Sequence, residues 1–218
     1  MADRALLQKT YEARDKYVRG LGEVNPYVLA PAMNPGFLGG VRWPDLRQAW
    51  RVIRRGPNTL VMSDGLSDPF AGDPAPNVGF GVEVLAETPD ALPDALQKTW
   101  LFDVVYLVSQ QCAGHGGVRD LIDEMGLLSL ELPASDVLQP AATPNGRAGV
   151  LLGVAMPQFP SEFMLPGGAA KVVTAKLLWP SELEYITSHG HAAREELAQR
   201  FAADGTHHRS SLARKAVV

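Results

Sequence analysis

Thr59 to Phe70 reads TLVMSDGLSDPF, an apolar run that passes directly into a polar turn rich in aspartate, serine and glycine. A second apolar run lies just upstream, at 50–53, and residues 56–58 between the two are Gly-Pro-Asn. Glycine, proline and asparagine together favour a tight turn because they supply unusual backbone angles at low cost. The sequence therefore predicts a β-hairpin that ends in the polar turn.

The next stretch, GFGVEV at 79–84, predicts a further strand. Phe80, Val82, Val84 and Ala86 occupy every second position, with other residue types between them. Because side chains alternate between the two faces of a strand, this period of two is typical of a strand that is covered mainly on one face. Glu83 is then expected on the opposite face.

Helices are predicted at both ends and in the middle of the chain. Near the N-terminus Leu7, Tyr11, Arg14 and Val18 form one helical stripe, with Asp3 as a suitable cap. Residues 25–44 contain so many prolines and glycines that they are expected to form an irregular arm over the core. Further helices are expected at 96–112, at 118–125, and from Pro180 to Gly190 with Ser181 and Glu184 as a capping box; a last helix carries the apolar stripe Ala193, Leu197 and Phe201. Further strands are expected at 127–132, 149–155 and 171–179.

The predicted elements do not alternate strictly between strand and helix, as a doubly wound parallel sheet requires. We expect instead an α+β fold, with a mixed, largely antiparallel sheet flanked by helices in a single domain. Residues 1–48 would form the N-terminal helix and the proline- and glycine-rich arm, packed on the core. The main α+β domain would span 49–206, and 207–218 would be a flexible tail.

Composition excludes several classes of protein. The 218 residues contain one cysteine, so an internal disulfide is excluded. Twenty basic and twenty-four acidic side chains give a net charge of −4, which leaves no cationic surplus for nucleic acid. Charges interrupt the start of the chain where a signal peptide needs apolar residues, and no apolar run reaches the roughly 20 residues of a membrane span. We expect a cytoplasmic protein that binds neither nucleic acid nor membrane.

Cys112 and His115 are residue types that could form a thiolate–imidazole pair. Cys112 is expected near the C-terminal end of the helix at 96–112, however. The negative end of the helix dipole raises the pKa of a thiol there and weakens it as a nucleophile. A buried structural cysteine is therefore the favoured interpretation.

The histidines near the C-terminus are candidates for metal binding. His189 and His191 lie just before the last predicted helix and His207 and His208 follow it, with Glu195 one turn away as an additional ligand. Zinc needs three or four such ligands that converge on one point. Solvated histidines at helix ends are the commoner case. Together with Cys112 and His115, these histidines define the alternative function, a small hydrolase or metalloenzyme.

The polar turn itself, Ser63 to Phe70, holds two serines and two carboxylates, which are the ingredients of acid–base or nucleophilic chemistry. The same residue types also build turns by hydrogen bonding to their own backbone. The chain offers no G-x-S-x-G elbow and no phosphate-binding glycine loop to complete an active site. A structural turn, with Gly65 at a positive φ, is the favoured interpretation.

Two parts of the sequence together resemble a known family. TLVMSDGLSDPF followed by GFGVEV is similar to the central signature of suppressor-of-fused-like domains, in which a strand enters a T/S-D-G-L-S turn and the next strand begins with glycine and an aromatic residue. LLWPSELEYITSHG (177–190), with REELAQRF (194–201), resembles bacterial members of that family. The resemblance spans about 49–212.

The resemblance implies a mixed α/β domain that binds protein, without a catalytic centre or a cofactor. The animal member holds a transcription factor, but this chain matches only one domain of it, so that partner is not carried over. Bacterial members are proposed to be immunity proteins that neutralise a toxin. An acidic protein is suited to covering a basic toxin domain, because complementary charge speeds encounter.

These considerations favour a non-enzymatic protein-binding domain, an immunity protein with a basic toxin domain as its partner. Loops on a rigid scaffold carry most binding functions, so the loop at 64–77 and the arm at 25–44 are the expected surface. Asp64, Asp68, Phe70 and Asp73 are the candidate contact residues. A scaffolding role within a larger assembly is a third interpretation.

Overall fold

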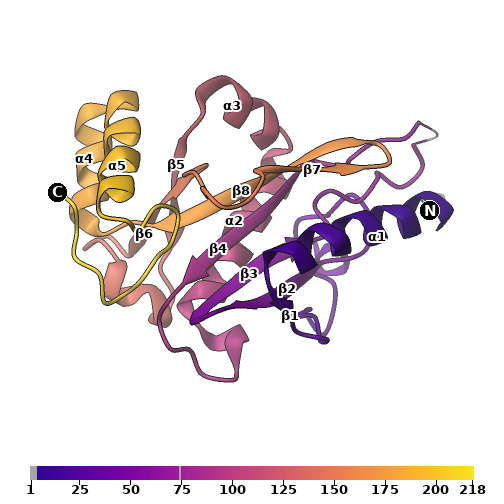
Figure 1. Cartoon of the computed structure of the whole chain (residues 1–218), viewed down its shortest axis with the longest axis horizontal. Coiled ribbons are helices and arrows are strands. Elements are labelled where there is room, and N and C mark those ends of the chain that lie inside the picture. The colour runs from indigo at the N-terminus through magenta and orange to yellow at the C-terminus, as the bar shows by residue number, and fades with distance from the viewer. Residues whose placement is uncertain (1–3, 74) are drawn as a thin grey trace.

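The computed structural model describes residues 4–73 and 75–218. Figure 1 shows one continuous sheet with α1 and α2 on opposite faces and α4 and α5 stacked at one end. The helices are α1 (Arg4–Leu21), α2 (Trp100–His115), α3 (Val118–Met125), α4 (Pro180–His189) and α5 (His191–Ala203). The strands are β1 (Glu23–Val24), β2 (Ala49–Arg55), β3 (Asn58–Asp64), β4 (Val82–Thr88), β5 (Leu128–Pro133), β6 (Arg147–Leu152), β7 (Glu162–Leu165) and β8 (Gly168–Leu177).

The sheet has the strand order β1-β2-β3-β4-β8-β6-β5, and β7 pairs with β8 off this path. All pairs are antiparallel except β4 with β8. Strand β8 meets β4 along one side, and on its other side it meets first β7 and then β6. The expected α+β fold with a mixed, largely antiparallel sheet is therefore confirmed.

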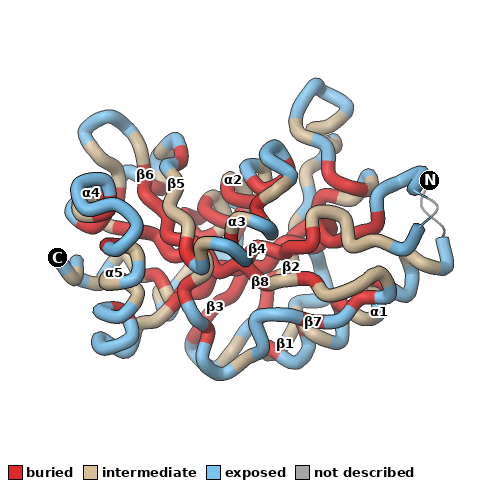
Figure 2. The backbone as a smooth tube through the Cα atoms, turned by 90° about the horizontal axis from the view of Figure 1, so that it is seen from above, coloured by how far each residue is buried: buried red, intermediate tan, exposed pale blue. Residues whose placement is uncertain are grey.

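The core has a layer on each face of the sheet. Val84 of β4 packs with Val104 of α2 on one face, whereas Leu85 packs with Val18 of α1 on the other. A third apolar group joins α4 and α5 to the end of the sheet around Leu151. In Figure 2 the buried backbone is concentrated along β3, β4 and β8 in the middle of the molecule.

Strand β4 differs from the prediction of a strand covered mainly on one face. All seven of its residues are buried. Glu83 and Glu87, which the alternating pattern placed on an open face, are each 0% exposed. Their face is covered by α1 and by the end of the chain. Glu83 pairs there with Arg14, and Glu87 pairs with Arg55 and contacts His208. A period of two in hydrophobicity therefore misses a second buried face whose polar residues are paired.

The N-terminal helix follows the predicted stripe, and Arg14 and Val18 on that stripe are buried. Asp3, the predicted cap, lies outside the described residues. The arm contains a short 3-10 helix, Pro35–Leu38, and a bridge between Leu29 and Trp50 that ties it to β2. Strand β7, which follows a proline-rich loop, was not predicted. Among the described residues, no helix is long and apolar enough to cross a membrane.

Two expectations near the C-terminus are wrong. The start of α4 is capped by Glu182, whose carboxylate accepts the Trp179 backbone N–H at 2.8 Å, rather than by Ser181 with Glu184. The segment from 207 to 218 is not a frayed tail. Its Ser210 hydroxyl accepts the Leu177 backbone N–H at 2.9 Å, and Arg214 pairs with Glu182. These buried polar contacts hold the segment against β8 and α4.

Candidate functional site

The polar turn is built around Arg14, a fully buried arginine on α1. Its Nε lies 2.6 Å from Asp64 Oδ1, and its Nη1 lies 2.7 Å from Asp68 Oδ1 and 3.4 Å from Glu83 Oε1. Arg47 and Arg51 pair with Asp64 from the outer side. Burial disfavours every one of these charges, but three carboxylates raise the pKa of Arg14 and three arginines lower the pKa of Asp64. Arg14 and Asp64 are therefore both charged, and each compensates the other.

Glu83 closes the turn from β4. Its Oε1 accepts the backbone N–H groups of Gly65 at 3.1 Å and Ser67 at 3.0 Å, together with the Ser67 hydroxyl at 2.6 Å. Its Oε2 accepts the Ser63 hydroxyl. A buried carboxylate that accepts several N–H and O–H groups fixes their positions. Both serines of the turn are thus structural donors rather than nucleophiles.

Asp68 has a weaker place in this group than Asp64. Its side chain is 0% exposed, and the contact with Arg14 lacks hydrogen-bond alignment, so both carboxylate oxygens are without a hydrogen-bond partner among the described residues. Burial and, to a lesser extent, the nearby charge of Glu83 outweigh the opposing effect of Arg14, and together they raise the pKa of Asp68 to about 6. The pKa of Asp68 is therefore raised toward neutral pH, and burial raises the pKa of its neighbour Glu83 as well.

The burial of Asp64 and Asp68 changes their predicted role. Asp64 is 2% exposed and Asp68 is 0% exposed, which leaves neither carboxylate a surface for direct contact with a partner. Their shared partner inside the protein, Arg14, lies 50 residues from Asp64 along the chain. The interpretation of the turn as structural therefore fits its geometry, and any binding role of these two aspartates is indirect.

The turn supports the arm at two glycines. A Cβ on Gly65, at a φ of +150°, would lie 3.0 Å from the Trp43 ring and 2.4 Å from the Arg47 carbonyl oxygen. A Cβ on Gly79 would lie 2.7 Å from Pro44 Cγ. Both positions need glycine because the arm lies directly on the turn. The polar turn and the strand start that follows it therefore form the base on which residues 43–47 rest.

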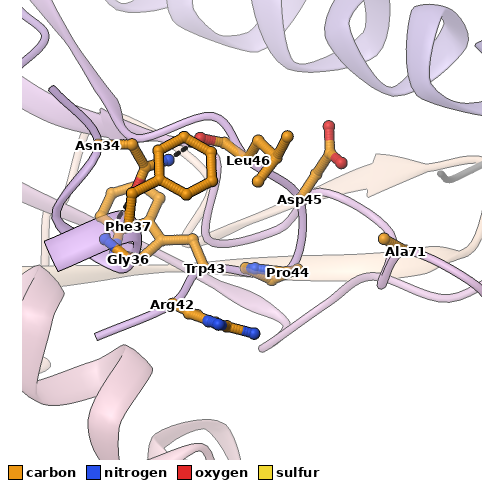
Figure 3. Close-up of a pocket in the computed structure, with 9 residues that line it drawn as sticks. All are labelled: Asn34, Gly36, Phe37, Arg42, Trp43, Pro44, Asp45, Leu46 and Ala71. Carbon is orange, nitrogen blue, oxygen red and sulfur yellow. Dashed lines mark hydrogen bonds between the residues drawn. The ribbon is translucent and has the colours of Figure 1, made fainter. Parts of the chain in front are cut away.

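A pocket of about 290 Å³ opens in this part of the arm. Figure 3 shows Phe37, Trp43 and Leu46 close together around it, with the Asp45 carboxylate pointing away from them. Trp43 is 5% exposed and packs edge-on against Trp50 with 5.4 Å between ring centroids. Phe37 and Leu46, by contrast, are 68% and 64% exposed. The buried Trp43 ring thus forms the floor of the pocket, and Phe37 and Leu46 face solvent at its edge. We call this pocket, lined by residues of the 34–46 segment and by Ala71, the arm pocket.

A chain of side-chain amides holds the arm in place. The Asn34 amide donates to the Leu46 carbonyl and its oxygen accepts the Gly36 backbone N–H at 2.8 Å. Gln48 donates to the Val41 carbonyl at 2.9 Å and accepts from Gln110 of α2 at 3.1 Å. These bonds replace the regular backbone pairing that the prolines prevent. The arm is consequently ordered without being a strand or a long helix.

The other two candidate contact residues lie on the adjoining loop. Phe70 is 37% exposed and packs edge-on against Phe80, with 5.3 Å between ring centroids. Asp73 is exposed, and its carboxylate accepts the backbone N–H of Ala75 at 2.9 Å. Ala71 joins the lining of the arm pocket, and its N–H donates to the Pro44 carbonyl. Phe70 therefore adjoins the arm pocket in sequence, and its role in binding stays a prediction.

Cys112 and His115 do not form the thiolate–imidazole pair that the alternative function requires. Cys112 is 1% exposed in the core, and its burial raises the pKa of the thiol to about 12, so the thiolate needed by a nucleophile is absent at neutral pH. His115 forms a local contact at the end of α2, where its Nδ1 accepts the Gly117 N–H.

The C-terminal histidines also do not converge. His208 is buried against Glu87, and His189 Nδ1 lies 3.0 Å from the Tyr185 carbonyl oxygen. Within residues 4–73 and 75–218, no three side chains of histidine, cysteine, aspartate or glutamate gather as metal ligands would.

Several residues of this site were not predicted from the sequence. Arg14 was placed on an otherwise apolar stripe, and a charged residue in that position signals a buried ion pair. Glu83 carried no such signal because it fitted the alternating pattern of a half-exposed strand. Trp43, Phe37 and Leu46 fell in the proline-rich arm, where no periodicity indicates which side chains face the core.

Replacing Arg14 tests the importance of the buried ion group. We expect Arg14→Met to lower the free energy of unfolding by about 3–5 kcal/mol, because it leaves buried carboxylates without their cation. Arg19→Met on the same helix is the matched control, since Arg19 only forms an exposed pair with Asp15 and should change stability by about 0.5 kcal/mol or less. Urea unfolding measures both. Equal effects of the two substitutions would contradict the assignment.

Asp68 gives the folded protein a characteristic pH dependence. Between the ordinary pKa of 3.8 and the folded value of about 6, the unfolded chain has lost the Asp68 proton while the folded chain keeps it. Stability from this group is therefore lost as pH rises through that window. Relative to Asp68→Asn, the wild type should lose about 3 kcal/mol of unfolding free energy between about pH 4 and pH 7. Parallel pH profiles for the two proteins in urea unfolding would disprove this.

Comparisons with known proteins place the fold. No protein-family model matches the sequence, and no curated protein matches it. The structure is similar to a chain of "the Sufu-Fu complex crystal structure", with a TM-score of 0.58 and 15% identity over 97% of this chain and 92% of that chain. It is also similar to Drosophila Suppressor of Fused, with a TM-score of 0.45 and 16% identity over 73% of this chain and 39% of that chain. The chain thus has the fold of a Suppressor of Fused domain.

Proposed function

We propose that this chain is a protein-binding domain and that the arm pocket with its exposed rim is its binding surface. The first support is the fold, which is shared along nearly the whole chain with a Suppressor of Fused chain solved in complex with Fu. That structure concerns another protein, and the low identity transfers no contact residues. The argument for this chain therefore rests on its own surface.

The observation that carries the proposal is the concentration of exposed apolar side chains on the arm. Among the described residues, most large exposed apolar side chains belong to the arm and the adjoining loop. Outside these two segments only Met164 and Val218 are large, apolar and exposed. Those of the arm and loop are Tyr27, Val28, Met33, Phe37, Leu38, Leu46 and Phe70. Soluble proteins rarely expose many large apolar side chains in one region, and such a region usually marks an interaction site.

The shape and chemistry of the arm pocket favour a protein partner. Phe37 and Leu46 project from an ordered base, so little conformational entropy is lost when a partner covers them. Arg42 and Asp45 lie at the same pocket and supply a polar rim of both charges. Interfaces between proteins typically have an apolar centre with aromatic anchors and a polar rim of this kind.

We propose as the finer identity of the partner a basic toxin domain, which would make this chain a cytoplasmic immunity protein without enzymatic activity. The net charge of −4 and the resemblance of 177–201 to bacterial family members support this identity. The arm pocket contributes apolar contact rather than charge. Acidic side chains around it, including Asp73 on the adjoining loop, would then guide the encounter.

A double substitution in the arm pocket tests the binding surface. We expect Phe37→Asp with Leu46→Asp to reduce recovery of bound proteins from source-cell extract by more than about tenfold, because two exposed anchors are lost. Met164→Asp is the matched control, since Met164 is 70% exposed on β7 and lies away from the arm pocket. Thermal unfolding should be unchanged in both variants. Affinity capture followed by mass spectrometry provides the measurement.

The same variants distinguish the partner classes. If a recovered protein is a toxin, production of the wild type and of Met164→Asp should restore growth of cells that express it, whereas the arm-pocket variant should not. Recovery of the same proteins by the wild type and the arm-pocket variant would refute the assigned surface. Recovery of a non-toxic partner that depends on Phe37 and Leu46 would support protein binding and refute the immunity role.

A further inference from the structure

A second pocket, of about 470 Å³, lies at the other end of the β2–β3 hairpin from the arm pocket. Its walls come from three parts of the chain: the hairpin turn at 55–58, the loop at 156–158 after β6, and residues 205–209 after α5. We call it the tail pocket because the C-terminal segment forms one side of it. These three segments are far apart in the sequence, and the C-terminal one was predicted to be flexible. The pocket is therefore visible only in the folded structure.

The tail pocket is basic in a protein that is acidic as a whole. Its described lining residues include Arg55, Arg209, His207 and His208, and no aspartate or glutamate is among them. Arg209 donates to the backbone carbonyls of its own turn, and no described carboxylate pairs with it. His207 has a φ of +48°, a left-handed conformation that non-glycine residues rarely adopt. Arg55 is paired with Glu87, so the charge without a counter-ion among the described residues is that of Arg209, and such a charge in a concave site attracts anions.

Below the lining residues, Glu87 orients three hydrogen-bond donors of the pocket. Its buried carboxylate accepts hydrogen bonds from Arg55 and Asn58, and from His208 Nε2 at 2.7 Å. Burial would raise the pKa of Glu87, but these donors outweigh it and lower the pKa to about 2, so the carboxylate is charged. Each donor group therefore has a fixed orientation before any ligand arrives.

The fixed orientation leaves two buried nitrogen atoms without a partner. Arg55 Nη1 is a donor without an acceptor, and His208 Nδ1, on the ring edge away from Glu87, also has no hydrogen-bond partner. Because His208 Nε2 donates its proton to Glu87, the neutral ring offers Nδ1 as an acceptor. Buried polar atoms in native proteins are nearly always satisfied, so these two nitrogens are expected to have a partner from outside the chain, either a water or a polar group of a ligand.

A phosphate group has the chemistry that these atoms require. Its oxygens accept from Arg55 Nη1 and from the guanidinium of Arg209, and arginine is well suited to such oxygens. The remaining P–OH group of the monoanion can donate to His208 Nδ1. A carboxylate or a sulfate offers acceptors only. We propose that the tail pocket binds a small molecule that carries a phosphate group, independently of protein binding at the arm pocket.

Amide NMR spectra of the full chain, titrated with inorganic phosphate at constant ionic strength, test this site. We expect saturable shifts of the Gly56, Asn58 and Gly205 amides and none at the arm pocket. Arg209→Gln should weaken phosphate binding by about tenfold or more, because it removes a charged donor that the fold does not use in an ion pair. Arg54→Gln, on the same strand as Arg55 but outside the pocket lining, should leave the affinity unchanged.

Sulfate and citrate titrations complete the experiment. Sulfate, which lacks the donor for His208 Nδ1, should bind more weakly than phosphate, and citrate should not exceed phosphate. Equal or tighter binding of either anion would overturn the assignment to phosphate. The absence of saturable shifts with phosphate, or an unchanged affinity in Arg209→Gln, would overturn the site itself.

Discussion

The guanidinium of Arg14 lies among the carboxylates of Asp64, Asp68 and Glu83 without access to water, and the position of the polar turn depends on this contact. A single buried ion costs several kcal/mol in lost hydration, which only close counter-charges and hydrogen bonds can offset. The four side chains come from α1, from the end of β3, from the turn and from β4. Satisfying Arg14 therefore requires that these four segments meet at one point.

The consequence extends from the ion group to the surface. Glu83 fixes the backbone of the turn, the glycine of the turn leaves room for Trp43, and Trp43 forms the floor of the arm pocket. The exposed side chains of Phe37 and Leu46 therefore lie on a well-packed floor, formed by Trp43 and supported by the polar turn. A preorganised apolar surface can bind a partner without first paying for its own ordering.

Much of the fold was predictable from hydrophobic periodicity and turn residues, because both act locally. The hairpin, the N-terminal helix and the class of sheet follow from such patterns. The buried partners of Arg14 and Glu87 do not, since those pairs join residues that are far apart in the sequence. Glu83 and Glu87 had the spacing of solvent-facing residues, and only the tertiary structure shows that α1 and the C-terminal segment cover them.

The candidate site was predicted in part for the same reason. The arm and the loop at 64–77 follow from the rule that loops carry function, but their side chains could not be sorted without a period to indicate which of them face inward. Of the three aspartates in the loop, Asp64 and Asp68 are buried and Asp73 is exposed. The apolar residues Phe37 and Leu46 of the arm are also exposed.

Hydrogen exchange of the Gly65 and Ser67 amides tests most directly whether the buried ion group fixes the turn. Both amides donate to Glu83 Oε1, at 3.1 Å and 3.0 Å. They follow the end of β3 at Asp64, so no strand pairing protects them from exchange. We predict that they exchange only on global unfolding, with the same free energy and urea dependence as core amides of β4, whereas the amide of exposed Ala75 exchanges rapidly. Fast exchange of Gly65 and Ser67 by local opening would contradict the account.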